Sequence, residues 1–164
     1  MHTINIKKIH NNIIKELFKK NSTERFLVQS IDNYILLTNA HMIVKVPDNE
    51  FFLNQDHLYK NDIVLCKFND FTQGDLIELE EKYTLENNDI TGIKKVVKYE
   101  RAGTVNEQAI YIDEKYKKLI TKDSKIYMCK NEHTVKLNFD IPHILVGTSE
   151  DYIEAVILGV RINE

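Results

Sequence analysis

Hydrophobic residues recur at helical spacing near the N-terminus. Between residues 4 and 19 the apolar positions form one stripe, made of Ile6, Ile9, Ile13 and Leu17, and lysines occupy the opposite face. A spacing of three and four residues is typical of an amphipathic helix that buries one face. The pattern therefore predicts a helix over residues 4–19 that ends at Asn21-Ser22-Thr23.

Alternation of apolar and polar residues replaces this spacing after residue 25. Residues 26–31 and 34–38 flank the turn pair Asp32-Asn33 and predict a hairpin, and residues 42–46 predict a third strand that Pro47 stops. Acidic turns separate the next short strands, which are predicted at residues 51–53, 63–68, 76–80 and 93–99.

The most apolar stretch lies near the C-terminus, at residues 152–162. It predicts a central strand that is covered on both faces. Alternating runs at residues 125–130 and 134–139 predict two more strands. Before them, Asp113 is placed to cap a helix over residues 113–122.

Both ends of the chain thus read as a helix followed by strands. This order predicts an α+β fold in which two helix-plus-antiparallel-sheet halves, roughly 1–90 and 91–164, form a single domain over residues 1–164.

Composition favours an ordinary globular chain of 164 residues, 43% apolar and 29% charged. No apolar run approaches the ~20 residues of a membrane span, and residues 1–20 are too polar for a signal peptide. We therefore expect a cytoplasmic protein with no membrane partner. Cys66 and Cys129 are expected to be small buried side chains. Heavy use of Ile, Lys and Asn suits an AT-rich genome, including many phages.

Charge is distributed unevenly along the chain. Residues 1–25 hold six Lys or Arg against two Glu, a net charge of +4, whereas residues 48–91 hold eleven acids against three Lys, a net charge of −8. A protein divided in this way can contact a polyanion with one surface and repel it with another.

The common enzyme signatures are absent, so we expect a protein that is not an enzyme and needs no cofactor or metal. Two weaker patterns remain as alternatives. Cys129, His133 and His143 could supply zinc ligands, but structural zinc normally has four. Asp48, with Glu80-Glu81-Lys82, matches the loose pattern of metal-dependent nucleases, in which carboxylates hold magnesium. Asp75, Glu78, Glu80 and Glu81 are more simply read as solvated acids.

Three short passages resemble the bacterial DNA sliding clamp, the β subunit of the replicative polymerase. Residues 37–43, Leu-Thr-Asn-Ala-His-Met-Ile, are similar to the Thr-Asp-Gly-His-Arg-Leu turn of that family. Residues 112–116, Ile-Asp-Glu-Lys-Tyr, resemble the start of the last helix of the clamp. Residues 158–161, Leu-Gly-Val-Arg, resemble the Leu/Met-Pro-Val-Arg at the C-terminus of the clamp chain, with Gly159 in place of proline. Residues 48–108 have no counterpart.

The resemblance implies a DNA-clamp-like duplication in which helices face duplex DNA. Lysines on such helices contact phosphates without reading sequence; the matching residues are Lys8, Lys15, Lys19, Lys115, Lys118 and Lys122. It also implies a site for peptides of replication proteins, at Thr38, His41, Ile43, Leu158, Val160 and Arg161. Because a full clamp chain has three domains, a ring built from this chain requires a homo-oligomer.

Three functions follow from these patterns. The first is a non-catalytic, sliding-clamp-like DNA replication protein that binds duplex DNA, replication proteins or both. The second is a phage interaction protein that docks on a host replication factor and modulates it. The third is a metal-dependent nuclease that uses Asp48, Glu80 and Lys82.

Overall fold

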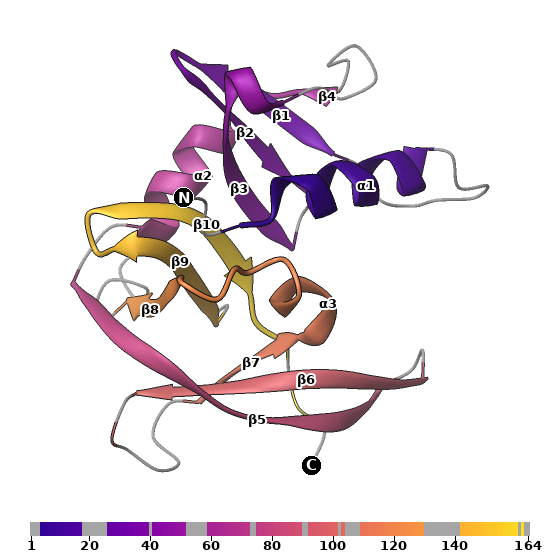
Figure 1. Cartoon of the computed structure of the whole chain (residues 1–164), viewed down its shortest axis with the longest axis vertical. Helices are drawn as coiled ribbons and strands as arrows, with labels where there is room; N and C mark the ends of the chain where they lie inside the picture. The colour runs from indigo at the N-terminus through magenta and orange to yellow at the C-terminus, as the bar shows by residue number, and fades with distance from the viewer. Residues whose placement is uncertain are drawn as a thin grey trace.

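A computed structural model describes most of the chain. The described residues are 4–17, 26–39, 41–51, 59–72, 75–89, 92–101, 103, 109–129, 142–160 and 162. Within them, ten strands form a single sheet in the order β4-β1-β2-β3-β10-β9-β8-β5-β6-β7. The pairs are antiparallel except β1 with β4. The coarse prediction of a mixed, mostly antiparallel α+β fold is thus confirmed (Figure 1).

The strands in chain order are β1 (Leu27–Ile31), β2 (Tyr34–Thr38), β3 (Met42–Pro47), β4 (Tyr59–Lys60), β5 (Leu76–Asp89), β6 (Gly92–Arg101), β7 (Ile110–Asp113), β8 (Lys125–Cys129), β9 (His143–Ser149) and β10 (Tyr152–Leu158). The helices are α1 (Ile6–Leu17), η1 (Asp48–Glu50), α2 (Val64–Thr72) and α3 (Glu114–Lys117). Every predicted strand whose residues are described is present, apart from residues 51–53 and 63–68. Phe51 lies outside the strands, and residues 52, 53 and 134–139 lie outside the described residues.

Strand β10 lies in the middle of the sheet, as its apolar sequence predicts. Ala155 and Ile157 belong to the core on the face that carries α1 and α3. Val156 belongs to the core on the opposite face, against α2. All three side chains are buried. Because successive side chains of a strand alternate between faces, a strand covered on both sides has to be apolar at every position.

Helix α1 confirms the predicted amphipathic helix for residues 6–17. Ile9 and Ile13 are fully buried and join the core on the first face, a contribution of roughly 1.5–3 kcal/mol each. Asn5 caps the helix, since its side-chain Oδ1 accepts a hydrogen bond from the Lys8 N–H at 3.0 Å.

Helix α2 corrects the prediction of a strand at residues 63–68. Val64, Phe68 and Phe71 are its buried side chains, and their spacing of four and three places them on one helical face. The Asn61 side chain accepts the Ile63 N–H at 2.9 Å, and the Gln29 side chain of β1 accepts the Leu65 N–H at 2.8 Å. These two acceptors satisfy backbone donors where the helix begins, so the apolar run folds as a helix across β1, β2 and β10.

The helix predicted over residues 113–122 is correct in position but too long. Asp113 caps it, with its side chain accepting the Lys115 N–H at 3.0 Å. Helix α3 nevertheless spans only Glu114–Lys117, because the chain then turns and Ile120 pairs with Ile4. Tyr116 and Leu119 are buried, and Ile120 is half-buried. The pairing of Ile120 with Ile4, far away in the same chain, ends the helix one turn after it begins.

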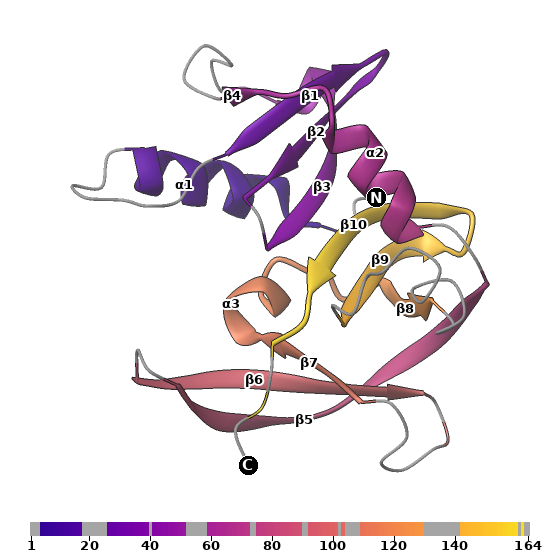
Figure 2. The ribbon, with the colours of Figure 1, turned by 180° about the vertical axis from the view of Figure 1, so that it is seen from behind.

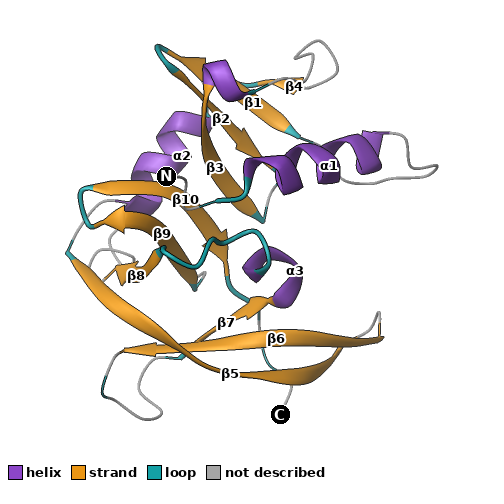
Figure 3. Cartoon of the chain, viewed as in Figure 1, coloured by secondary structure: helices purple, strands orange, loops and turns teal. Residues whose placement is uncertain are grey.

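Strands β3 and β10, far apart in sequence, lie side by side in the sheet. Beyond β3 lie β2, β1 and β4, and beyond β10 lie β9, β8, β5, β6 and β7. The predicted halves, roughly 1–90 and 91–164, meet in sequence between β5 and β6, two strands that pair along most of their length. Figures 2 and 3 show α1 and α3 together on one side of the sheet, with α2 on the other.

Candidate nucleic-acid interface

The lysine-bearing helices α1 and α3 are held together by the backbone. Ile4 pairs with Ile120, and the Asn5 N–H donates to the Leu119 carbonyl at 2.7 Å. The Lys8 Nζ donates to the Lys118 carbonyl at 3.1 Å. The start of α1 is therefore fixed against the end of α3, and two lysine-bearing segments far apart in sequence share one face of the molecule.

A hollow of about 160 Å³ lies between these two segments. It brings together one lysine from each, Lys15 of α1 and Lys115 of α3, and both side chains are exposed. The remaining lining residues are Ile9, Asn12, Phe26, Asn39, Met42 and Tyr116. Two ammonium groups and two amides around a small hollow can receive an anion of the size of a phosphate, because each is a hydrogen-bond donor.

The side of this hollow opposite α1 is built on the turn between β2 and β3. Asn39 is buried, and its Oδ1 accepts the N–H groups of His41 at 3.0 Å and Met42 at 3.1 Å. Its Nδ2 donates to the Tyr116 hydroxyl at 3.2 Å. The Thr38 hydroxyl donates to the Met42 carbonyl at 2.6 Å. One asparagine thus fixes the turn and also connects it to α3.

Lys115 of the hollow and the nearby Lys118 have partners of different kinds. Lys118 forms an ion pair with Glu114 at 3.4 Å, at the i,i+4 spacing of a helix surface. Lys115 lies over the Tyr116 ring, with its Nζ 5.0 Å from the ring centroid. Such exposed contacts each contribute about 1 kcal/mol or less.

Lys122 is not part of this hollow. It lines a separate one of about 350 Å³, together with Lys117, Glu78 and Glu81. Lys117 and Glu81 form an ion pair there at 3.6 Å. Carboxylates in this second hollow make it a poorer place for DNA than the first. Lys19 lies outside the described residues.

The residues predicted to bind peptides cluster where β3 begins and β10 ends. His41 is exposed and stacks on Tyr116 with 6.0 Å between ring centroids, and its carbonyl accepts the Leu158 N–H at 2.8 Å. Thr38 and Ile43 are buried, and Ile43 faces α2. The Val160 N–H donates to Tyr111, and Arg161 lies outside the described residues. The structure therefore leaves His41 as the exposed side chain of the turn.

The residues of the nuclease alternative are far apart in the sheet. Asp48 follows β3 and Glu80 lies in β5, with β10, β9 and β8 between those strands. Four strand spacings of about 4.8 Å separate them by roughly 19 Å along the sheet. Glu80 instead pairs with Lys82, which lowers the pKa of its carboxyl group. No cluster of three His, Cys, Asp or Glu side chains suited to a metal occurs among the described residues.

The described part of the zinc alternative consists of Cys129 and His143. The Cys129 thiol donates to the Phe71 carbonyl at 3.2 Å, and burial raises its pKa to about 11. The His143 ring packs edge-on against Phe71, with 4.7 Å between centroids. Of the three residues of the zinc alternative, the two that the structure describes both contact Phe71. His133 lies outside the described residues.

Sequence reasoning named Lys15 and Lys115, which line this hollow, but missed Asn39, Tyr116 and Met42 as parts of it. A signal for Asn39 was present, because an asparagine directly after a strand often accepts hydrogen bonds from the following backbone. No such local signal connects residue 39 to residue 116.

In comparisons with known proteins, no family model, curated protein or solved structure matches the chain. In the described part of the chain, none of the helices has the length and apolar character that crossing a bilayer requires.

Proposed function

We propose that the chain is a non-catalytic, sliding-clamp-like DNA replication protein that contacts the phosphates of duplex DNA through the face carrying α1 and α3. The observation that carries the proposal is that Lys15 and Lys115 line the same hollow, although they are 100 residues apart in sequence and come from different helices. Duplex DNA presents phosphates at regular spacing, and paired ammonium groups contact them independently of sequence.

Charge across the molecule supports the same orientation. Helix α1 carries Lys7, Lys8 and Lys15 against Glu16, whereas α2 on the opposite face carries one lysine, Lys67, against Asp70. A polyanion is therefore attracted more strongly to the α1 face than to the α2 face. In this proposal the chain acts as a homo-oligomer, because one domain of this size cannot surround a duplex, and His41 and its neighbours receive replication proteins.

The test is a fluorescence anisotropy titration of a labelled 20-base-pair duplex, about the length of two helical turns, with the full chain at several salt concentrations. We expect affinity to fall steeply as salt rises from about 50 to 200 mM. The double variant K15E/K115E is expected to bind at least about tenfold more weakly and to show a shallower salt slope, by about two phosphate contacts.

The matched control is K60E/K67E, which reverses two exposed lysines of β4 and α2. It changes the net charge by the same amount, so it isolates the position of the lysines from their number. Equal weakening in both variants, or no binding of the wild type at about 50 mM salt, contradicts the proposal. A light-scattering mass equal to one chain at the concentrations where DNA binds contradicts the clamp-like assembly.

A further inference from the structure

The ladder between β3 and β10 stops halfway along both strands. Within the described residues, Met42, Ile43 and Val44 pair with Ile157, Val156 and Ala155, and the pairing ends there. If the ladder continued in the same register, the next pairs would be Lys45 with Glu154, Val46 with Ile153 and Pro47 with Tyr152. On their outer sides, Lys45, Val46 and Pro47 pair with β2, and Tyr152 and Ile153 pair with β9. We call the open segment between them the fork.

A β-bulge in β10 opens the fork. The pairing of β10 with β9 runs from Ile153–Gly147 to Ala155–Val146, so Glu154 is an extra residue in β10. A bulge bends its strand and increases the local twist. Gly147 makes this bend possible, because a Cβ at that position would lie 2.3 Å from the Tyr152 carbonyl oxygen. The opening is therefore built into the backbone of the sheet.

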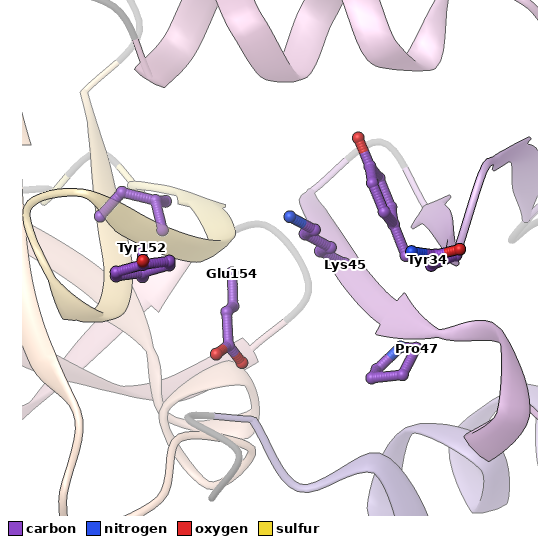
Figure 4. Close-up of a pocket in the computed structure, with 7 residues that line it drawn as sticks. Tyr34, Lys45, Pro47, Tyr152 and Glu154 are labelled. Atoms are coloured by element: carbon purple, nitrogen blue, oxygen red, sulfur yellow. The ribbon is translucent and has the colours of Figure 1, made fainter.

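The fork contains a hollow of about 540 Å³, which is in the range of pockets that bind ligands. Its lining residues are Asn33, Tyr34, Lys45, Pro47, Tyr152, Ile153 and Glu154. Figure 4 shows Tyr34 and Lys45 on one side of the hollow and Tyr152 and Glu154 across from them. Tyr152 is 70% exposed, more than the other large hydrophobic residues that are exposed in the described part, Ile63 and Tyr83.

Backbone groups of β3 point into this hollow. The Asp48 N–H donates toward β2, to Asn33, and the His41 carbonyl accepts from β10, at Leu158. Since hydrogen-bonding groups alternate sides along a strand, the N–H and C=O of Lys45 and the C=O of Pro47 face the fork. An exposed strand edge of this kind recognises an extended peptide by adding it as a further strand.

The side chains around the fork specify what that peptide carries. The Lys45 Nζ lies 4.3 Å from the centroid of the Tyr34 ring, which holds the ammonium group at the hollow. A carboxylate of the peptide is its complement on the Lys45 side of the hollow, because an ammonium group donates up to three hydrogen bonds, whereas the Glu154 carboxylate lies across from it. Tyr34, Pro47, Ile153 and Tyr152 offer apolar surface to an aromatic or aliphatic side chain beside it.

We propose that the fork between β3 and β10 binds an extended segment of a partner protein by β-strand addition, with an acidic residue at Lys45 and an apolar side chain between Tyr34 and Tyr152. This site lies at the opposite end of β3 from the DNA-facing hollow that Met42 lines, so it can be occupied independently of DNA.

The test uses the full chain as bait for a displayed library of random seven-residue peptides. The strongest binder is then labelled with fluorescein and titrated. We expect binders with an acidic residue next to an aromatic or aliphatic one. Y152A and K45E are each expected to weaken binding by about tenfold or more, as removal of a central contact does.

The control I63A truncates another exposed apolar residue, 49% exposed and outside the fork, and should bind as the wild type does. K15E/K115E should also leave peptide binding unchanged. Hydrogen exchange supplies a readout of the strand addition itself, because the Lys45 amide becomes protected when a peptide pairs with it.

The proposal is overturned if no library peptide depends on both Lys45 and Tyr152. It is equally overturned if the selected peptide binds without slowing exchange at Lys45, since the hollow then accepts side chains or small molecules without adding a strand. Circular dichroism of each variant distinguishes a lost contact from a lost fold.

Discussion

The two ends of strand β3 differ in how their hydrogen bonds are used. At the Met42 end, the Asn39 and Thr38 side chains hold the turn, and the adjacent β3–β10 ladder is closed. At the Pro47 end, a bulge bends β10, the neighbour of β3, and the two strands leave an open fork between them. The same two strands thus form a rigid support for a charged surface at one end and an unpaired edge at the other.

This difference indicates that the two candidate sites depend on different physical features. The hollow proposed to face DNA depends on buried side-chain hydrogen bonds, and a buried group that loses its partner costs free energy. The fork depends on backbone geometry that a single glycine permits. Changes at one end should therefore alter one site and leave the other intact.

The largest effect is expected from G147A, which removes the geometry of the open end. The added methyl group meets the backbone of Tyr152 and Ile153 and not a flexible side chain, so the strands have to shift. We expect a loss of about 3 kcal/mol in the free energy of unfolding, at the upper end of overpacking effects. Urea unfolding followed by circular dichroism measures it.

The comparison variant for this prediction is G103A. Gly103 has a positive φ of 80° but nothing within 4 Å of an added Cβ. Its replacement is strained by conformation alone and should cost about 1 kcal/mol. If G103A is as destabilising as G147A, then close packing at the bulge is not what keeps the fork open.

The next effect concerns the closed end. N39A removes the acceptor for the His41 and Met42 N–H groups and the donor to the Tyr116 hydroxyl. Because these groups are then left unsatisfied near the core, we expect a loss of about 2 kcal/mol in unfolding free energy. Duplex affinity should fall as well, since Tyr116 and the neighbouring Lys115 lose their support.

Asn33 offers a matched control for Asn39, because it is an exposed turn asparagine at the other end of β2. N33A should change the unfolding free energy by no more than about 0.5 kcal/mol. An N39A protein with unchanged stability and unchanged DNA affinity contradicts the role assigned to Asn39 in joining the turn to α3.

These contacts also show what sequence alone could predict. The period of the apolar residues located α1, the hairpin β1–β2 and the central strand β10, because each of these buries a face that its own pattern defines. Asp113 was identified as a cap from its type and position. Lysines 15 and 115 could be predicted to be exposed, but not to share one hollow, since that depends on the pairing of Ile4 with Ile120.

The failures have a common physical cause. Residues 63–68 form part of a helix because Phe71 extends their buried face and Gln29, 36 residues away, accepts a hydrogen bond from its first turn. The fork likewise depends on contact between Gly147 and Tyr152 across a hairpin. Local patterns report burial, but they do not report which distant residue supplies a hydrogen bond or a close approach.

A smaller effect is expected from acidification, through His10 of α1. Its ring packs against Phe51, just beyond the open end of β3, at 5.3 Å between centroids, and burial lowers its pKa. A lowered pKa means that the unfolded chain takes up this proton at higher pH than the folded chain. Stability contributed by the neutral His10 is therefore complete above about pH 6.5 and is lost as pH falls below that value.

The measurement for His10 is the thermal midpoint between pH 7.5 and pH 5.5, values on either side of the ordinary histidine pKa of about 6.5. H10L keeps an apolar side chain against Phe51 and removes the titration, so its midpoint should decline less over this range. An equal decline in both proteins shows that other groups control the acid sensitivity.

The smallest effect on stability is expected from Y152A at the open end. Its side chain is 70% exposed, so truncating it removes little buried surface, and we expect a change within about 0.5 kcal/mol in urea unfolding. Y127A provides the contrast, because Tyr127 is buried in the core against α2 and its truncation should cost about 3 kcal/mol or more. A large loss of stability in Y152A would assign this tyrosine to the fold itself. If Y152A loses almost no unfolding free energy but binds peptides more weakly, then the exposed Tyr152 ring serves peptide recognition and not the fold.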